Sequence, residues 1–202
     1  MSRATQKFCH AERSEASPSG DEILRGAQDD KSWQVSEATE ADWPGIWAIF
    51  HDVVQGGDTY SYAADTAEDE AKNLWMGAGK YGTGAQAFVV KEAGMVIGTY
   101  SLRRNHYGHG AHVANAGYMV HRDHRGKGVA RALCKHSLEE AKRQGCLSMQ
   151  FNYVVSTNTR AVELWQSMGF TIIGVSPKSY RHATLGYVDI YIMHRFLDGV
   201  AA

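Results

Sequence analysis

A short basic segment containing two glycines joins a predicted strand to a predicted helix, and this junction constrains the fold more than any other feature. The segment Arg125–Gly128 has the sequence Arg-Gly-Lys-Gly, and it lies between the apolar strand 113–121 and the amphipathic helix 127–144. The first N–H groups of a helix have no partner within it and carry partial positive charge, so they bind anions. The two glycines let a phosphate approach the backbone, and the two cations attract it. The junction therefore predicts a pyrophosphate-binding loop.

The glycine spacing excludes two other phosphate-binding motifs. A Walker loop needs Gly-x-x-x-x-Gly-Lys-Ser/Thr, and the dinucleotide fingerprint needs a third glycine inside a βαβ unit. Residues 121–130 contain neither pattern. A Gly-x-Gly turn alone also occurs at ordinary strand–helix junctions, so the interpretation depends on the surrounding elements.

Apolar periodicity along the chain predicts an α+β fold. The expected strands are 33–38, 86–92, 95–103, 113–121, 147–155, 170–175 and 187–196. The expected helices follow Thr39 as far as Gly56, and then cover 66–76, 127–144 and 159–168. The order β-α-α-β-β-β-α-β-α-β-β starts with an antiparallel run and leads into a β-α-β crossover with parallel strands. We expect a mixed, mostly antiparallel central sheet with helices on both faces.

The first 32 residues differ in composition from the remainder. From Cys9 on they are charged, small and polar, with only Ile23 and Leu24 as apolar bulk before Trp33. Such a segment buries too little surface to offset its ordering entropy. We expect residues 1–32 to be a disordered tail, or an extension from a start codon assigned too far upstream. The folded domain is expected at 33–198.

Charge and cysteine content narrow the function classes. The formal net charge is −1, which offers no electrostatic footprint for nucleic acid or an anionic membrane. No stretch approaches the roughly 20 apolar residues of a membrane span, and the N-terminus lacks a secretory signal. The three cysteines, Cys9, Cys134 and Cys146, are an odd number without zinc-ligand spacing. We expect a cytoplasmic protein with reduced thiols.

A histidine cluster raises the question of a metal. His106, His109 and His112 lie close together in a loop and at a strand start. No cysteine or paired carboxylate completes a ligand set, so we predict no metal site.

Two motifs make the phosphate-loop interpretation specific. Arg125-x-x-Gly128-x-Ala130 follows the strand segment Tyr118-Met119-Val120, and it resembles the acetyl-CoA signature of the GNAT acetyltransferases. A second match is Asn158-x-x-Ala161-x-x-Leu164-Trp165-x-x-Met168-Gly169-Phe170, which resembles the helix flanking the other side of the cofactor in that family. Together with the element order, the resemblance covers residues 33–196. It implies the GNAT fold, with one parallel strand pair that splays apart.

The resemblance also implies the chemistry. Acetyl-CoA is the expected cosubstrate, with its pantetheine arm between the splayed strands and its thioester carbonyl polarised by a backbone N–H near Met119. The amine attacks directly, and that N–H stabilises the oxyanion. The implied cofactor-binding residues are Tyr118, Met119, Val120, Arg125, Gly126, Lys127, Gly128, Val129, Ala130, Asn158 and Trp165.

Two positions depart from the commonest family pattern. Asn115 stands where many members have a glutamate base, and Trp165 stands where many have a tyrosine acid. Neither an amide nor an indole transfers protons at neutral pH. Either another residue moves the proton, or the amine loses its proton to solvent before it attacks.

The departures resemble the fungal acetyltransferases that N-acetylate proline analogues such as azetidine-2-carboxylate. That resemblance rests on Asn115-Ala116-Gly117-Tyr118, Phe151-Asn152, Thr157-Asn158, Gly57-Asp58-Thr59-Tyr60, Val188-Asp189 and Trp165. It implies that Asn115 and Asn152 are catalytic and that Tyr60, Asn115 and Asn152 bind substrate. Ordinary roles are open as well, because Asn158 suits a helix N-cap, Trp165 suits core packing, and Tyr60 suits a buried loop anchor.

Four functional hypotheses are open. The first is a small-molecule N-acetyltransferase, expected to be a homodimer by family likeness. The second is a protein or peptide N-acetyltransferase, which an open acidic groove would favour. The third is a non-catalytic acetyl-CoA-binding module, motivated by the two departures. The fourth, more distant, is an unrelated nucleotide-binding fold.

Overall fold

The computed structural model describes residues 33–77 and 84–197, and every structural statement below concerns these residues. The predicted tail 1–32 lies outside them. The strands are β1 Val35–Glu37, β2 Gln86–Glu92, β3 Met95–Arg104, β4 Val113–Val120, β5 Ser148–Val155, β6 Thr171–His182 and β7 Gly186–Phe196. The α-helices are α1 Trp43–Gly56, α2 Glu68–Met76, α3 Val129–Arg143 and α4 Thr159–Ser167. Short 3-10 helices are η2 Glu40–Asp42, η3 Gly108–Gly110 and η4 Arg122–His124.

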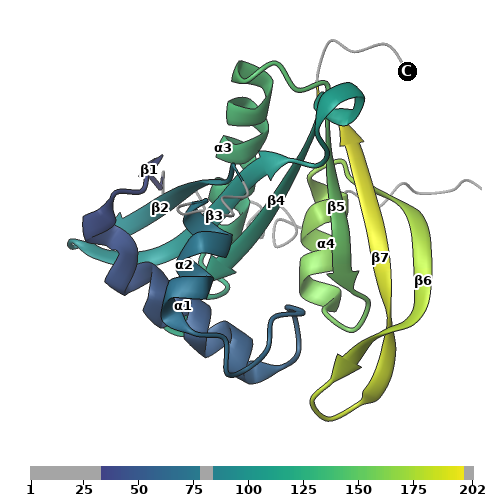
Figure 1. The fold of residues 1–202 in the computed structure, drawn as a ribbon, viewed down its shortest axis with the longest axis horizontal. Coiled ribbons are helices and arrows are strands. Elements are labelled where there is room, and N and C mark those ends of the chain that lie inside the picture. Colours follow the sequence, from purple (N-terminus) through teal and green to yellow (C-terminus); the bar gives the residue numbers. More distant parts are fainter. Residues whose placement is uncertain (1–32, 78–83, 198–202) are drawn as a thin grey trace, which may run out of the picture. The chain divides into compact units, whose positions relative to one another are not determined.

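The strands form one sheet in the order β1-β2-β3-β4-β5-β7-β6 (Figure 1). Every neighbouring pair is antiparallel except β4 and β5, which are parallel. The parallel pair flanks the α3 crossover, as the expected β-α-β unit requires. The predicted mixed, mostly antiparallel α+β sheet is confirmed.

The parallel pair is joined at only one end. Its ladder consists of Val113 opposite Ser148 and Ala114 opposite Met149, and the strands diverge beyond it (Figure 1). At the fork the Asn115 side-chain N–H donates to the Gln150 carbonyl oxygen at 2.9 Å. This side-chain bond joins the two strands at the first position beyond their backbone ladder. The splay exposes one edge of each strand in the middle of the sheet.

Helices cover both faces of the sheet because its central strands are apolar on both sides. In β2, Phe88 and Val90 pack in the core beneath α3 and α4, while Ala87 and Val89 pack in a second core beneath α1 and α2. Figure 1 shows α1 and α2 on one face and α3 and α4 on the other. Alternate residues of a strand point to opposite faces, so an uninterrupted apolar run supplies side chains to the cores on both faces of the sheet.

The loop after α1 brings polar side chains to the open end of β4. Gly57 ends α1 in the left-handed conformation, with φ of 59°, and its N–H donates to the Val54 carbonyl. The Tyr60 hydroxyl then donates to the Tyr118 carbonyl oxygen at 2.9 Å. An added Cβ at Gly117 would lie 3.1 Å from that hydroxyl, so glycine is required for this close approach.

The sequence prediction was wrong about the length of β6. We expected a strand ending at residue 175, but β6 continues to His182 and forms a long hairpin with β7. Its second half is polar and contains Pro177, so apolar alternation did not reveal it. Backbone pairing with β7, including Tyr180 opposite Val188, extends the strand past an irregularity between Ser176 and Tyr180.

Candidate active site

A cavity of about 880 Å³ occupies the opening between β4 and β5. Its lining includes the loop 58–62, residues 115–120 of β4, residues 151–155 of β5, and parts of α4. The loop 124–131 also lines it, except for Lys127. The sequence-predicted residues of the phosphate loop, the splayed strands and the substrate group are therefore brought to one cavity.

The start of α3 provides an anion-binding end to this cavity. Gly128 is the N-cap residue, with φ of 78° and no side-chain cap, and the Ala132 N–H makes the first bond, to the Gly128 carbonyl. The N–H groups of residues 128–131 therefore have no partner within the helix. Arg125 lines the cavity beside them. Lys127 is exposed and lies outside the lining, while its carbonyl accepts the Trp33 indole N–H at 3.0 Å.

The β4 backbone presents a second set of donors. The His121 N–H donates to the Ile97 carbonyl, and the Asn105 N–H donates to the Val113 carbonyl. The backbone N–H and C=O groups of the odd-numbered residues of β4 therefore point toward β3. Because strand backbone groups alternate in direction, the N–H groups of Tyr118 and Val120 face the opening. The Met119 N–H faces β3, and its side chain is buried under α1 and α2. The backbone N–H groups that could fill the role expected near Met119 are therefore those of Tyr118 and Val120.

These donors fit acetyl-CoA, a ligand with a pyrophosphate at one end and an amide-containing arm. The open helix N-terminus beside Arg125 matches the phosphates. The unpaired strand edges at the opening match the secondary amides of the arm. Such amides can hydrogen-bond to free backbone groups in the way that an added strand would.

The α4 side of the cavity combines capping and packing. The Asn158 side chain accepts the Ala161 N–H at 3.3 Å, so it caps α4 as well as lining the cavity. The Trp165 ring lies 4.9 Å from the Tyr118 ring and 5.2 Å from the Phe151 ring, measured between centroids. Trp165 is buried, so its cofactor contact would be through the ring face that lines the cavity.

Two stacked tyrosines form the opposite wall. The Tyr60 and Tyr62 rings are 5.7 Å apart, with an interplanar angle of 9°. Burial raises the pKa of Tyr60 far above its ordinary value, and the neighbouring Tyr62 adds to the effect. The Tyr60 hydroxyl therefore stays protonated at neutral pH, where it is a donor and not a base.

The two predicted catalytic asparagines differ in their surroundings. Asn115 is 8% exposed and donates to the Gln150 carbonyl, so part of its role is to join the strands at the fork. Asn152 is exposed, and its side-chain N–H donates to the Asn105 amide oxygen at 2.6 Å. Asn152 lies at an irregularity in the β5–β7 register between Phe151 and Val154, which turns it toward the cavity.

Sequence reasoning did not single out Ser101 and Arg103 at the substrate end, and it named Thr59 only as part of the motif Gly57-Asp58-Thr59-Tyr60. Thr59, Ser101 and Arg103 line the cavity between the stacked tyrosines and β3. The Thr59 and Ser101 hydroxyls are buried without a hydrogen-bond partner among the described residues. The alternation of Ser101 and Arg103 in β3 could have placed them on one face, but only the register with β4 sets Arg103 opposite Asn115.

The architecture and site define an acyl-CoA-binding transferase fold, and the comparisons with known proteins identify it. The model of the Acetyltransferase (GNAT) family matches residues 33–170. The chain belongs to this family, a class of acyltransferases whose acyl donor is acetyl-CoA.

Individual relatives are similar over different lengths. A GCN5-related N-acetyltransferase from Kribbella flavida is 43% identical, with a TM-score of 0.77 over 83% of this chain and 99% of that one. The yncA protein of Salmonella typhimurium, solved with its cofactor acetyl-CoA, is 26% identical, with a TM-score of 0.69 over 84% and 96%. The N-acetyltransferase aca1 of Schizosaccharomyces pombe is 36% identical over 98 residues, or 48% of this chain. The match spans about half of that curated relative, 47%.

Two further features bear on partners. None of the helices in residues 33–77 and 84–197 is long and apolar enough to cross a membrane. Within the same residues, no group of three or more histidines, cysteines, aspartates or glutamates is arranged to hold a metal ion.

Proposed function

We propose that this chain transfers the acetyl group of acetyl-CoA to the amine of a small molecule, an amino acid or a proline analogue. The observation that carries the proposal is the fork between β4 and β5. There, unpaired strand N–H groups and an open helix N-terminus line one cavity with Tyr60, Asn115 and Asn152.

In the proposed mechanism the protein contributes binding and polarisation. The N–H groups of residues 128–131 hold the pyrophosphate, and acetyl-CoA supplies a reactive thioester. The N–H of Tyr118 or Val120 donates to the thioester carbonyl and to the negative charge that develops on it. Tyr60 and Asn152 position the amine for direct attack, which contributes through proximity.

Proton transfer is assigned to solvent in this proposal. Tyr60 and Tyr62 stay protonated because burial raises the pKa of both hydroxyls. The Tyr118 hydroxyl bonds Ser137 on α3 at 2.7 Å. The attacking amine is therefore neutral before it binds. We expect kcat/KM to rise with pH up to the pKa of the acceptor amine, and to shift when an acceptor of different pKa is used.

The shape of the substrate end favours a small acceptor over a peptide. An acidic groove would suit a basic peptide, but the only acidic residue among the described lining residues is Asp58. The Tyr60 hydroxyl also donates to the Tyr118 carbonyl of β4, and the Tyr60 carbonyl accepts from the Tyr180 hydroxyl of β6, so both strands hold the loop in place. A homodimer is proposed in addition, supported by exposed apolar side chains on the β6–β7 hairpin, among them Ile173 and Tyr187. Cytoplasmic location stays a prediction.

The test is release of coenzyme A thiol from acetyl-CoA across a panel of amines. The panel holds azetidine-2-carboxylate, proline, hydroxyprolines, common amino acids, polyamines and short peptides. Turnover of free amino or imino acids supports the proposal. Turnover confined to peptides replaces it with peptide acetylation. Binding of acetyl-CoA without turnover of any amine favours the non-catalytic module.

A further inference from the structure

We propose that Arg103, with the hydroxyls of Ser101 and Thr59, forms a carboxylate-binding corner that selects α-amino or cyclic imino acids as acceptors. The inference rests on the proposed acetyltransferase activity and specifies its substrate. It assigns substrate specificity to residues that belong neither to the phosphate loop nor to the pair Asn115 and Asn152.

The first support is the unbalanced charge of Arg103. Arg103 is half-buried and lines the cavity, and among the described residues no aspartate or glutamate forms an ion pair with it. Its neighbour Arg104 bonds the carbonyls of Ala111 and Gln144 and the sulfur of Cys146. Adjacent strand residues point to opposite faces of the sheet. Arg104 is therefore held in structural hydrogen bonds on one face, and Arg103 presents its charge to the cavity on the other.

The second support is the pair of hydroxyls without partners. Buried polar groups in proteins are almost always hydrogen-bonded, so each exception requires an explanation. Ser101 is 6% exposed and lies two residues from Arg103 on the same face of β3, and Thr59 reaches the cavity from the loop after α1. Two hydroxyl donors and a guanidinium match the acceptor sites of one carboxylate.

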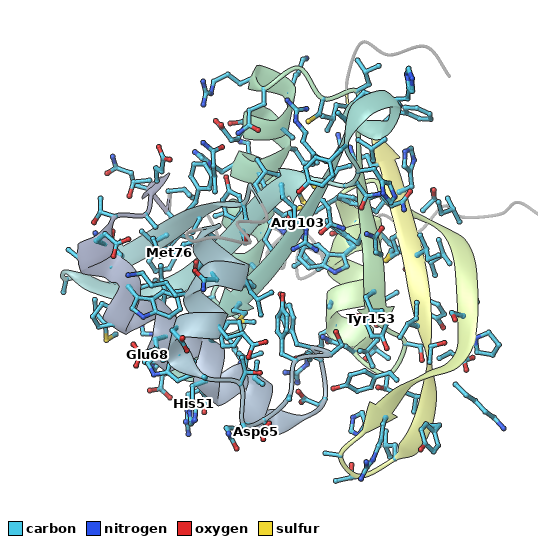
Figure 2. All side chains as sticks on the ribbon, in the orientation of Figure 1. His51, Asp65, Glu68, Met76, Arg103 and Tyr153 are labelled. Carbon is cyan, nitrogen blue, oxygen red and sulfur yellow. The ribbon has the colours of Figure 1, made fainter. Side chains whose placement is uncertain are left out.

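The third support is the position of this corner relative to the reacting carbonyl. Arg103 pairs with Asn115 across the β3–β4 ladder, and Figure 2 shows it near the opening, with Tyr153 on the β5 side. Burial raises the pKa of Tyr62, and the Arg103 guanidinium lowers it through its charge and a hydrogen-bonding contact. Tyr62 stacks on Tyr60, whose hydroxyl bonds the Tyr118 carbonyl. The cation is therefore linked to the strand that polarises the thioester through the two stacked rings of Tyr62 and Tyr60.

The placement of Arg103 and Tyr118 in the wall of one cavity determines the acceptor class that we propose. An amine that attacks near Tyr118 while its carboxylate binds Arg103 must carry both groups within a few bonds. Free α-amino and cyclic imino acids satisfy this condition, whereas a peptide N-terminus or a lysine side chain in a protein does not.

The experiment compares acids with their carboxamides. Wild-type protein, Arg103→Met, Arg103→Lys and the control Arg181→Met are assayed with azetidine-2-carboxylate, alanine and the two matching carboxamides. Arg181 is an exposed arginine of β6 outside the cavity lining, so its variant removes the same charge elsewhere. Melting temperature and acetyl-CoA affinity are measured for every variant.

We expect the wild type to prefer an acid over its carboxamide, and Arg103→Met to raise KM for the acid about 10- to 100-fold. KM for the carboxamide should rise much less than KM for the acid, because the carboxamide carries no charge for Arg103 to bind. Acetyl-CoA affinity should not change, and Arg103→Lys should recover part of the preference. Equal use of acid and carboxamide by the wild type overturns the corner and leaves acetyl transfer intact. Equal losses for both acceptors in Arg103→Met overturn it as well.

If no acceptor is turned over, the proposed function fails and binding decides the corner separately. Azetidine-2-carboxylate is then titrated calorimetrically into the protein–coenzyme A complex. Binding that is lost in Arg103→Met and kept in Arg181→Met supports the corner, and absence of binding to the wild type overturns it.

Discussion

The two ends of the cavity are built in different ways. The proposed cofactor end consists mainly of backbone from one continuous segment, β4 and the loop into α3, with glycine at the N-cap of that helix. The substrate end is made of side chains from four separate segments, represented by Tyr60, Arg103, Asn115 and Asn152. A site made of local backbone depends on the order of residues in one segment. A site made of distant side chains depends on the sheet register, which no single segment specifies.

The sharpest test of the cofactor end is Gly128→Glu. The substitution puts a bulky anion where the helix N–H groups are open, and it places a side chain at φ of 78°. We expect acetyl-CoA affinity to fall by more than about 100-fold, because the added carboxylate occupies and repels the phosphate position. Calorimetry with acetyl-CoA measures the effect.

The matched control for this variant is Gly186→Glu. Gly186 lies in the β6–β7 hairpin with φ of 74°, and an added Cβ there meets nothing within 4 Å. It introduces the same charge and similar backbone strain, about 1–3 kcal/mol, away from the cavity. Normal acetyl-CoA binding by Gly128→Glu would refute the loop assignment, and equal loss in both variants would attribute the effect to strain.

The same contrast explains which parts of the structure could be predicted from sequence. The order of the elements along the chain and the α3 crossover follow from apolar periodicity and glycine placement, and they were predicted correctly, while α3 begins at Val129 and not at the predicted Lys127. The splay itself was implied only by family resemblance, because periodicity does not report where a ladder ends. The sequence placed the polarising N–H only near Met119, since the direction of each backbone group depends on pairing with β3.

The substrate end was predicted only where single residues resembled a known family. Tyr60, Asn115 and Asn152 were found in this way, and all three line the cavity. Arg103 was not found, because a cationic residue near the end of a strand has no local signal. Its significance depends on the register opposite Asn115 and on the absence of an acidic ion-pair partner within residues 33–77 and 84–197.

Asn115 and Asn152 provide the next test, because one is expected to contribute to stability as well as rate and the other to rate alone. Asn115→Ala leaves the half-buried Gln150 carbonyl without this partner, so we expect a loss of about 1–3 kcal/mol in unfolding free energy, together with a loss of rate. Asn152→Ala changes an exposed group and should alter stability by less than about 0.5 kcal/mol while it lowers kcat/KM. Denaturant unfolding and steady-state kinetics measure both. A large stability loss for Asn152→Ala would make it a structural residue.

A smaller effect is expected for Tyr60→Phe. The variant keeps the stacked ring and removes only the hydroxyl that donates to the Tyr118 carbonyl, a bond contributing about 1 kcal/mol. We expect KM for the acceptor to rise several-fold, with acetyl-CoA affinity unchanged, because the loop 58–62 loses one tie to β4. A change in acetyl-CoA affinity as large as the change in acceptor KM would show that the two ends are not independent.

The smallest effect tests how far the substrate end depends on the start of α1. Asp42 accepts bonds from the Thr39 N–H and hydroxyl at 2.9 and 3.0 Å and pairs with Lys91. Burial raises the pKa of Asp42, but Lys91 and Thr39 outweigh it and hold the pKa below its ordinary value. A carboxyl with a lowered folded-state pKa stabilises above its unfolded pKa of about 4, and loses this contribution as pH falls through the folded value.

Asp42→Asn should therefore lower unfolding free energy by about 1 kcal/mol at pH 7, with the difference from wild type shrinking as the pH falls below the unfolded pKa of about 4. Thermal melts across pH measure this. Activity at pH 7 should stay within about twofold of wild type, because the loop 58–62 is tied to β4 by Tyr60 and not by the start of α1. A substantial loss of acceptor turnover without loss of acetyl-CoA binding would mean that the substrate end extends through the whole of α1, and the cofactor end would then be the only locally built part of the site.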